Sequence, residues 1–400
     1  MNKLIFKAGR RIKSYSRLYI PHNKKYKPSG VYASVHEFLA RNPDGGRLYE
    51  IFPSHVSRLE IDPEFVEACP PYLKPQMEID QPPAFVLEMP NGRAVADLLG
   101  RHIAYVSADN RLIGELSFQW ENGKMLPAEK NRILRQAYFD EPVFYHGNVF
   151  SLLSGAAGAF NYFHWFIDTF PKLCLAKKAG LLESIDWLLV PSFRHPFQKE
   201  YLALLGIHES RIIRGDEKRH IGAEKLIVPS HTRGSAAHIP EWIPRFYREE
   251  ILPKVKVNSQ AKRRIYISRN DSDKRRTLNE EQLIPILEKY GFEIHQLNNK
   301  STEEQIKLFA SAAFIVSPHG AGLSNLVYCS PGSRVIEFFP GGYVKATYYD
   351  LSKKCGLKYR HLIFDKDKEA SNAVEGQKIH ITADVGRIEH AIAESLEERE

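Results

Sequence analysis

The chain has little of what several protein classes require. Its four cysteines, Cys69, Cys174, Cys329 and Cys355, lie far apart and include no C-x-x-C pair. This scatter argues against a disulfide framework or a zinc knuckle and is typical of a reducing compartment. No stretch approaches the roughly 18 apolar residues that a membrane-spanning helix needs. The sequence also lacks G-x-G-x-x-G and Walker A motifs, so it indicates neither a dinucleotide site nor an ATP site of these kinds.

The composition is that of a globular chain with a positive net charge. The 400 residues, 43% of them hydrophobic and 26% charged, are more than one core usually organises, so we expect two domains. The net charge of +8 favours anionic partners such as phosphates, nucleic acid or acidic lipid. Lys and Arg are spread along the chain without a nucleic-acid-binding motif, so we expect no nucleic acid partner.

Residues 1–20 combine basic side chains with apolar residues at helical spacing. This pattern favours a short helix on an anionic membrane surface, but it is equally typical of a solvated basic tail. The segment lacks the apolar core and the cleavage site of a signal peptide. We therefore expect residues 1–30 to form a separate basic segment, with contact to a membrane surface as one of two alternatives.

The rest of the chain alternates between predicted strands and helices. Short apolar runs separated by prolines dominate residues 31–150 and predict short strands and loops. Later runs, "RIYIS", "FEIHQL", "AFIVS" and "RVIEFF", predict strands with helical patterns between them. Such alternation predicts a parallel sheet of right-handed β-α-β units and therefore an α/β fold. We place the two domains at residues 31–250 and 251–400.

Polar and glycine residues follow three of these predicted strands. Ligands of open α/β sheets bind beyond the carboxyl ends of the strands, so these residues should meet at one edge. Glycines let the backbone approach a ligand, a helix start offers N–H groups to an anion, and arginines match phosphate oxygens. Each group alone has a simpler explanation, as a turn, a solvated charge run or a strand-end acid, but together they favour a nucleotide-diphosphate site. The residues are Arg269, Arg275 and Arg276 after the first strand, His319, Gly320, Ala321 and Gly322 after the third, and Glu337 near the end of the fourth.

A second polar group lies in "FNYFHWFIDTFPKL", which is helical in character. Asn161, His164 and Asp168 stand at i, i+3 and i+7 and share one face of a helix. Burying these groups unpaired would cost several kcal/mol, so we expect them either to be hydrogen-bonded or to face a functional cleft. His164 and Asp168 pair with each other in one interpretation; in the other, one of them takes a proton from a hydroxyl nucleophile. Two such groups are too few for a metal site, so none is predicted.

The two polar groups together resemble glycosyltransferase family 61, in its bacterial branch near capsular polysaccharide biosynthesis proteins. The resemblance rests on "NYFHWFIDTFPKL", "YISRNDSDKRRTLNEEQL" and "SPHGAGLSNLVYCSPGSRVIEFFP", and on their order and spacing. It covers about residues 150–365. It implies a GT-B architecture, with two Rossmann-like domains whose parallel sheets face each other across a cleft. It also implies inverting, metal-independent transfer from a nucleotide-sugar donor to a glycan or lipid-linked acceptor.

The resemblance also implies roles for individual residues. Asp168 would be the catalytic base, with His164 as its partner or substitute, and Asn161 and Trp165 would lie on the acceptor side in the domain 31–250. The donor-binding residues, in the domain 251–400, would be Arg269 with Arg275 or Arg276 at the diphosphate, His319, Gly320, Ala321 and Gly322 at the phosphate and sugar, Asn325 in support of that loop, and Glu337 beside the nucleoside.

Two other functions remain open from sequence. A non-catalytic protein that binds a sugar nucleotide or glycan would use the same fold, and the intact polar residues argue against it without excluding it. A nucleic-acid-binding protein rests on net charge alone. The resemblance and the basic N-terminus favour a cytoplasmic enzyme on the inner membrane face, extending a surface or lipid-linked polysaccharide.

Overall fold

The computed structural model describes residues 12, 16, 24–96, 102–117, 119–121, 124–235, 237–257, 261–365 and 369–397. The chain divides into two compact units, Met1–His55 with Pro82–Thr232, and Val56–Gln81 with Arg233–Glu400. This division differs from the expected ranges 31–250 and 251–400, because an early segment and residues 233–250 both cluster with the second unit. Apart from residues 12 and 16, the basic helix expected over residues 1–20 lies outside the described residues.

The described strands of the first unit form a ten-stranded mixed sheet. Its carboxyl-terminal half is parallel, as expected, since β11 pairs in parallel with both β12 and β14. The amino-terminal half differs from the expected parallel sheet, because β5 and β6 pair antiparallel with β14. Strands β6 and β7 also pair antiparallel, whereas β1 pairs in parallel with β8. The strands are β1 Gly30–Tyr32, β2 Arg47–Phe52, β5 Ala84–Pro90, β6 Arg93–Ala96, β7 Ile103–Val106, β8 Arg111–Ile113, β11 Val143–Ser151, β12 Trp187–Val190, β13 Ile212–Arg214 and β14 His220–Pro229.

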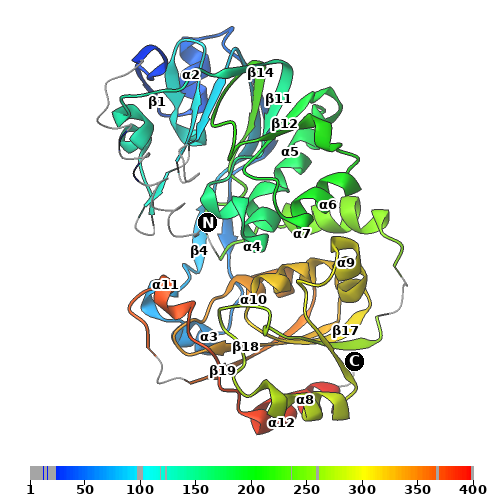
Figure 1. Ribbon diagram of the computed structural model, residues 1–400. Coiled ribbons are helices and arrows are strands. Elements are labelled where there is room, and N and C mark those ends of the chain that lie inside the picture. The colour runs from blue at the N-terminus through cyan, green and yellow to red at the C-terminus, as the bar shows by residue number, and fades with distance from the viewer. Residues whose placement is uncertain are drawn as a thin grey trace. The chain divides into compact units, whose positions relative to one another are not determined.

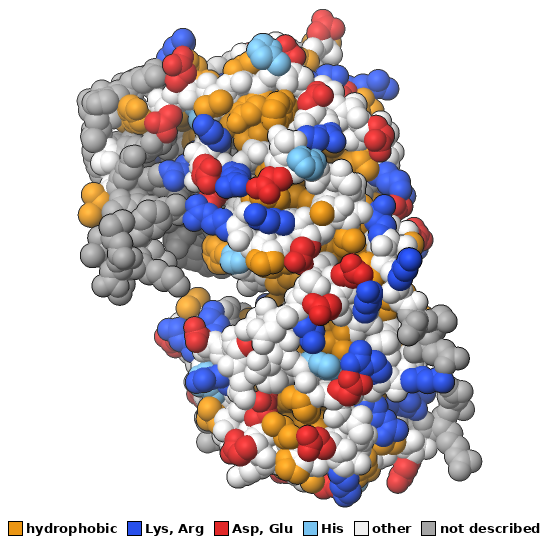
Figure 2. Space-filling view, turned by 45° about the vertical axis from the view of Figure 1, so that its right-hand side comes forward, with side chains coloured by type: hydrophobic (Ala, Val, Ile, Leu, Met, Phe, Trp, Pro, Cys, Tyr) orange, Lys and Arg blue, Asp and Glu red, His pale blue; other side chains and the backbone are white. Residues whose placement is uncertain are grey.

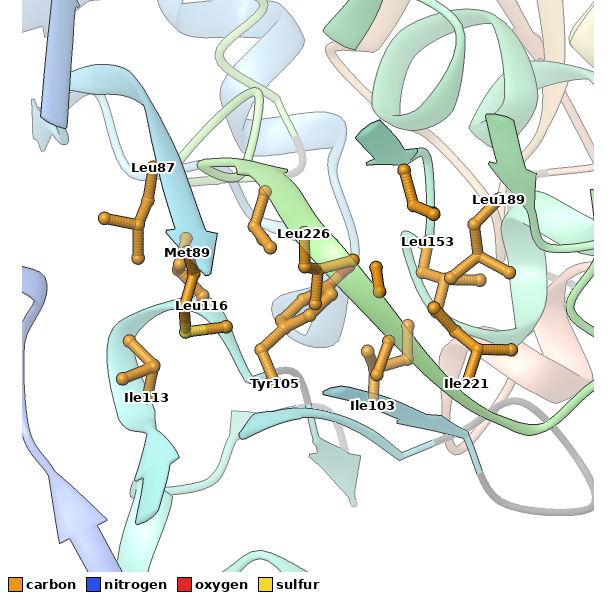
Figure 3. Close-up of a cluster of buried hydrophobic side chains, with 14 of the residues drawn as sticks. Leu87, Met89, Ile103, Tyr105, Ile113, Leu116, Leu153, Leu189, Ile221 and Leu226 are labelled. Carbon is orange, nitrogen blue, oxygen red and sulfur yellow. The ribbon is translucent and has the colours of Figure 1, made fainter. Parts of the chain in front are cut away.

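Apolar side chains of this sheet form one buried cluster (Figure 3). Leu87 and Met89 of β5 meet Leu226 of β14 there, with Tyr105 of β7 among them. Helix α5 packs against β5 and β14 and so stands on the core. The helices of this unit are α2 Val35–Arg41, α4 Tyr162–His164, the π-helical turn η7 Trp165–Thr169, α5 Lys172–Lys178 and α6 Pro196–Leu204.

The second unit contains a five-stranded parallel sheet in the order β16-β15-β17-β18-β19. The four strands predicted from the sequence are all present, and β19 extends the sheet. Helices α8 and α12 cover one face, while α9 and α10 lie on the other (Figure 1). The elements are β15 Arg263–Ile267, α8 Glu280–Lys289, β16 Phe292–His295, α9 Thr302–Ala310, β17 Ala312–Pro318, the 3-10 helix η12 Ala321–Tyr328, β18 Arg334–Pro340, α10 Thr347–Lys354, β19 Lys358–Phe364, α11 Ala373–Gly376 and α12 Val385–Glu397.

Strand β18 divides its side chains between the two faces of this sheet. Phe338 joins the cluster that includes Leu287 of α8 and Ile388 of α12. Phe339 joins a second cluster with Tyr349 of α10. Because side chains alternate along a strand, Glu337 shares the face of Phe339. An acid is thereby placed on the α10 side of a largely apolar strand.

The early segment Val56–Gln81 completes that second cluster. Phe65 of α3 is fully buried, and its ring lies 6.0 Å from Phe339 and 5.2 Å from Tyr349, between centroids. Tyr349 also donates its hydroxyl to Asp62 at 2.6 Å. The second unit is therefore built from two separate stretches of chain. Its further elements are β3 His55–Arg58, α3 Pro63–Ala68, β4 Glu78–Gln81 and α7 Trp242–Phe246.

The face seen in Figure 2 carries Lys and Arg side chains interspersed with Asp and Glu. In the part of the chain that is described, no helix combines the length and the apolar character needed to cross a membrane.

Candidate active site

The strand order of the second unit fixes where a ligand should bind. The first strand along the chain, β15, lies between β16 and β17, so the direction of winding reverses between β15 and β17. In open α/β sheets, ligands bind outside the carboxyl ends of the strands at this switch point. Ser268 and Arg269 follow β15, and His319 and Gly320 follow β17. The predicted donor residues therefore stand on both sides of the switch point.

Arg269 lies directly against Gly320. A Cβ atom built on Gly320 would come within 1.9 Å of Arg269 Nη1, so only glycine leaves room for the guanidinium. Arg269 Nη2 donates to Ser272 Oγ at 2.8 Å and to the carbonyl oxygen of Lys274 at 3.1 Å. Burial, helped by the charge of Arg275, lowers the pKa of Arg269 to about 10. Gly320 thus makes room for the Arg269 guanidinium in addition to forming part of the turn between β17 and η12.

Arg275 and Arg276, left as alternatives by the sequence, occupy different positions. Arg275 is buried and has a left-handed backbone, with φ 52°. Its Nε donates to the carbonyl oxygen of His319 at 3.0 Å, and its guanidinium lies over the ring of Tyr343. Arg276 has an exposed side chain, and its backbone N–H donates to His380 Nδ1 at 3.1 Å. Arg275 is therefore the one joined to the glycine loop.

His319 and Glu337 form a buried pair beneath that loop. His319 Nδ1 lies 2.5 Å from Glu337 Oε1, and Tyr359 donates its hydroxyl to Oε2 at 2.5 Å. The His319 ring also stacks on Phe339, with 5.1 Å between centroids. Burial raises the pKa of Glu337, whereas burial and the charge of Arg275 lower the pKa of His319. Glu337 is 0% exposed and has both oxygens engaged, so in this geometry it supports His319 and does not face a nucleoside.

The residues after His319 are held by packing and by one amide. A Cβ atom on Gly322 would lie 2.5 Å from Leu297 Cδ1, so any larger residue here would have to displace that leucine side chain. Asn325, fully buried in η12, donates Nδ2 to the carbonyl oxygen of Gly322 and to Gln305 Oε1, both at 3.1 Å. Gly320 itself is extended, and η12 begins at Ala321.

Positive charge accumulates at this edge of the sheet. After burial, the main causes that lower the pKa of Lys274 are the charges of Arg275, Lys378 and Arg269. Arg275 and Lys345 likewise lower the pKa of His319. These groups repel one another; Asp271 offsets part of the charge of Arg269, while Glu337, beside Arg275, is buried with a raised pKa. An anion at the switch point would relieve that repulsion.

The second polar group lies on a helix of the first unit that is not uniformly α-helical. Asn161 is exposed and caps α4 by accepting the backbone N–H of His164 at 3.4 Å. The chain then makes a π-helical turn, Trp165–Thr169, before α5. Such turns are rare and frequently occur at functional sites. His164 Nδ1 lies 2.6 Å from Asp168 Oδ2, with side chains 36% and 19% exposed, so the pair remains accessible.

Trp165 does not occupy the position expected of an acceptor contact. Its side chain is 0% exposed and stacks on Phe170, with 6.3 Å between ring centroids. Its indole Nε1 finds no hydrogen-bond partner among the described residues. The sequence pattern placed Trp165 beside the polar residues, but the helix turns it into the core.

Sequence reasoning missed a residue that extends the polar group inward. Lys172 is 2% exposed, and its Nζ donates to the carbonyl oxygen of Leu153 at 2.6 Å. The regular spacing of His164, Asp168 and Lys172, four residues apart, was the available signal. Tyr343 and Tyr359 were also missed, and they carried no local signal because they meet the loop only through the fold.

Across the residues that the structure describes, no three His, Cys, Asp or Glu side chains are grouped to hold a metal ion. The exposed loop after β15 contains Asp271, whose Oδ2 accepts the backbone N–H of Asn298 at 3.3 Å.

Two comparisons bear on the identity of the chain. Residues 162–336 match the sequence model of the family described as Glycosyltransferase 61. The chain is also 32% identical, over 87 residues, to a xylan glycosyltransferase of Arabidopsis thaliana, MUCI21. That alignment covers 20% of this chain and 18% of the relative, so the chain spans under one fifth of the relative's length. The family match contains both polar groups except Asn161 and Glu337, and over this region the chain is similar to that family.

Proposed function

We propose that this protein is a glycosyltransferase that transfers a sugar from a nucleotide-diphosphate donor to a glycan acceptor. The observation that carries the proposal is the mutually repelling group of Arg269, Arg275 and Lys274 at the switch point of the parallel sheet. A diphosphate fits that group in charge, and arginine forks fit its oxygens in shape. The family match and the glycosyltransferase relative support the same activity.

The proposed reaction inverts the configuration at the sugar carbon. The acceptor oxygen forms a bond to that carbon while the bond to the diphosphate oxygen breaks, and its electron pair leaves with the phosphate. Asp168 takes the proton of the acceptor hydroxyl, as a positioned base does. Arg269 and the backbone N–H groups that begin η12 stabilise the charge on the departing diphosphate, so the proposal assigns that task to the protein and not to a metal.

The proposal requires Asp168 and the donor residues to act on one pair of substrates. A GT-B-like arrangement of the two units would meet that requirement and is part of the proposal. His164 orients the Asp168 carboxylate through its Nδ1 contact at 2.6 Å. The acceptor is a glycan in this proposal, because the plant relative is named for a glycan.

A nucleotide-sugar panel tests the donor site first. UDP-, GDP- and dTDP-sugars are added to the purified chain, and the donor should raise its melting temperature, since ligands that bind only the folded state stabilise it. Arg269→Ala should abolish that shift, whereas Arg276→Ala, at an exposed position, should keep it. A panel in which no nucleotide sugar raises the melting temperature would contradict the donor site.

Transfer is then measured with the donor so identified and a set of oligosaccharide acceptors. Asp168→Asn should keep the melting shift and lose transfer by at least about a hundredfold, the lower range for general-base catalysis. Full activity in Asp168→Asn would exclude it as the base. A donor that binds without any turnover in the unmodified chain would favour a non-catalytic sugar-nucleotide-binding protein.

The cellular setting is a separate part of the proposal. Surface or capsular polysaccharide synthesis on the inner membrane face would bring a lipid-linked acceptor to a cytoplasmic enzyme. The basic residues 1–20 would then contact anionic lipid. Deletion of residues 1–20 should weaken binding to vesicles that contain phosphatidylglycerol, and unchanged binding would refute the membrane contact.

A further inference from the structure

Lys172 stands one helical turn beyond Asp168, on the face that also bears His164. Its side chain is 2% exposed, which is unusual for a lysine. Nζ donates to the carbonyl oxygen of Leu153 at 2.6 Å, which fixes the ammonium inside the first unit. The three ionisable side chains therefore form one line that runs from an accessible position to a buried one.

A buried ammonium requires a counter-charge. One carbonyl oxygen satisfies a single N–H of Nζ and does not neutralise the charge. Asp168 is the group whose charge favours the protonated form of Lys172. Lys172 also acts on His231, which follows β14. Burial, and next the positive charge of Lys172, lower the pKa of His231 to about 4. Asp168, Lys172 and His231 thus share one electrostatic environment, with His164 hydrogen-bonded to Asp168.

We propose that Lys172 is a positioning residue whose buried ammonium keeps Asp168 ionised as the base of the transfer reaction. The inference rests on the proposed function, because it needs Asp168 to accept a proton. An opposite charge nearby favours the ionised form of a carboxyl group. Lys172 does not touch the acceptor in this role; it sets the charge state of the group that does.

The inference predicts a pH signature that a merely structural lysine lacks. Burial lowers the pKa of Lys172 to about 7, so its charge is present below pH 7 and disappears above it. The stabilisation of ionised Asp168 by Lys172 should therefore also be present below pH 7 and absent above it. His231, with its pKa near 4, is neutral from pH 6 upwards and supplies no charge in place of the ammonium there. His164 contacts Asp168 whether or not Lys172 is charged.

The first experiment compares pH profiles of kcat/KM. In Lys172→Met, the acid limb should move to higher pH by about one unit or more, the usual effect of losing an opposite charge. Above pH 8 the variant and the unmodified enzyme should agree within about twofold. Lys172→Arg should restore the acid limb, and Lys178→Met, at an exposed site of the same helix, should leave the profile unchanged. Parallel profiles for Lys172→Met and the unmodified enzyme would overturn the inference.

A second experiment does not depend on activity, so it separates this inference from the proposed function. Urea unfolding is measured for Lys172→Met, Asp168→Asn and the double variant at pH 6 and pH 9. At pH 6 the change in the free energy of unfolding of the double variant should differ from the sum of the changes in the two single variants. At pH 9, where Lys172 is neutral, it should equal that sum. Additive shifts at both pH values would overturn the electrostatic link. If no donor supports transfer but the pH 6 coupling is present, the proposed function fails and the Lys172–Asp168 link stands.

Discussion

The guanidinium of Arg269 fills the space that any side chain at Gly320 would need. Nη1 lies 1.9 Å from the place of a Cβ atom at that glycine, and Cζ lies 2.8 Å from it. Gly320 has φ −171°, an extended conformation open to every residue, so the backbone does not demand glycine here. The glycine is required because Arg269, in the loop after the neighbouring strand β15, stands against it.

Gly320→Ala should therefore displace Arg269 while leaving the fold intact, because the obstructing atoms are the far end of a flexible side chain. Loss of one charge-assisted hydrogen bond, about 1.5–3 kcal/mol, predicts at least tenfold weaker binding of UDP or another matching nucleotide. Calorimetric titration measures this. Gly386→Ala, at an exposed helical position, is the matched control and should bind normally. Equal binding by both variants would show that the position of Arg269 is not needed.

Arg275→Lys and Arg276→Lys form a pair that tests which arginine supports the loop. Lysine keeps the charge but cannot donate at once to the carbonyl oxygens of His319 and Gln377, as the Arg275 fork does. Arg275→Lys should lower the melting temperature and weaken nucleotide binding, whereas Arg276→Lys should change neither measurably. The reverse order would assign the diphosphate contact to Arg276.

Glu337→Ala should destabilise the second unit strongly. It removes an acid whose two oxygens are engaged by His319 and Tyr359, so the buried His319 and the half-buried Tyr359 both lose a hydrogen-bond partner. Leaving a buried hydrogen-bonding group without its partner costs about 1–3 kcal/mol for each group, measured by urea unfolding. Glu337→Gln, which keeps the shape and one acceptor oxygen, should lose much less. A small loss in Glu337→Ala would show that the pair contributes little to the fold.

Lys172→Met should change how stability depends on pH. The pKa of Lys172 is about 7 in the folded chain against an ordinary 10.5, so between these values the unfolded chain binds more protons. Stability from this group therefore rises with pH in the unmodified chain and not in the variant. From pH 7 to pH 9 the free energy of unfolding of the variant, relative to the unmodified chain, should fall by about 2 kcal/mol. A constant difference across that range would place the Lys172 pKa outside it.

Phe65→Ala should lower both stability and donor binding. Phe65 is fully buried against Phe339, the ring on which His319 stacks. Truncating a buried phenylalanine costs about 3–5 kcal/mol. Val56→Ala, at a half-exposed position of the same segment, should stay within about 0.5 kcal/mol. If Phe65→Ala binds nucleotide normally once folded, the cluster has only a structural role.

Some of this architecture could be predicted because its signals are local. Apolar runs separated by helical patterns predicted four strands of the parallel sheet, and all four are present. The rule that ligands bind beyond strand ends then pointed to Arg269 and Gly320 without reference to their contacts. Each inference needed only the residues within one element or its immediate successor.

Other features depend on partners that are distant in sequence. The burial of Glu337 follows from the face of β18 that it occupies and from Tyr359 on β19. Trp165 is buried and stacks on Phe170, a packing contact that the spacing of the polar residues does not reveal. The antiparallel half of the first sheet depends on which strands meet β14, and apolar alternation does not specify that pairing.

The two-part construction of the second unit has a consequence for synthesis on the ribosome. Phe65 emerges early, but Phe339 and Tyr349, which enclose it, are made more than 270 residues later. At about 5–20 residues per second, that interval lasts roughly 15–55 s. During this time the segment Val56–Gln81 has no complete core to join, while the strands on both sides of it can already assemble the first sheet. The apolar side chains of this segment therefore stay without packing partners in the nascent chain until Phe339 and Tyr349 are made. We expect a chaperone to bind the segment during that interval.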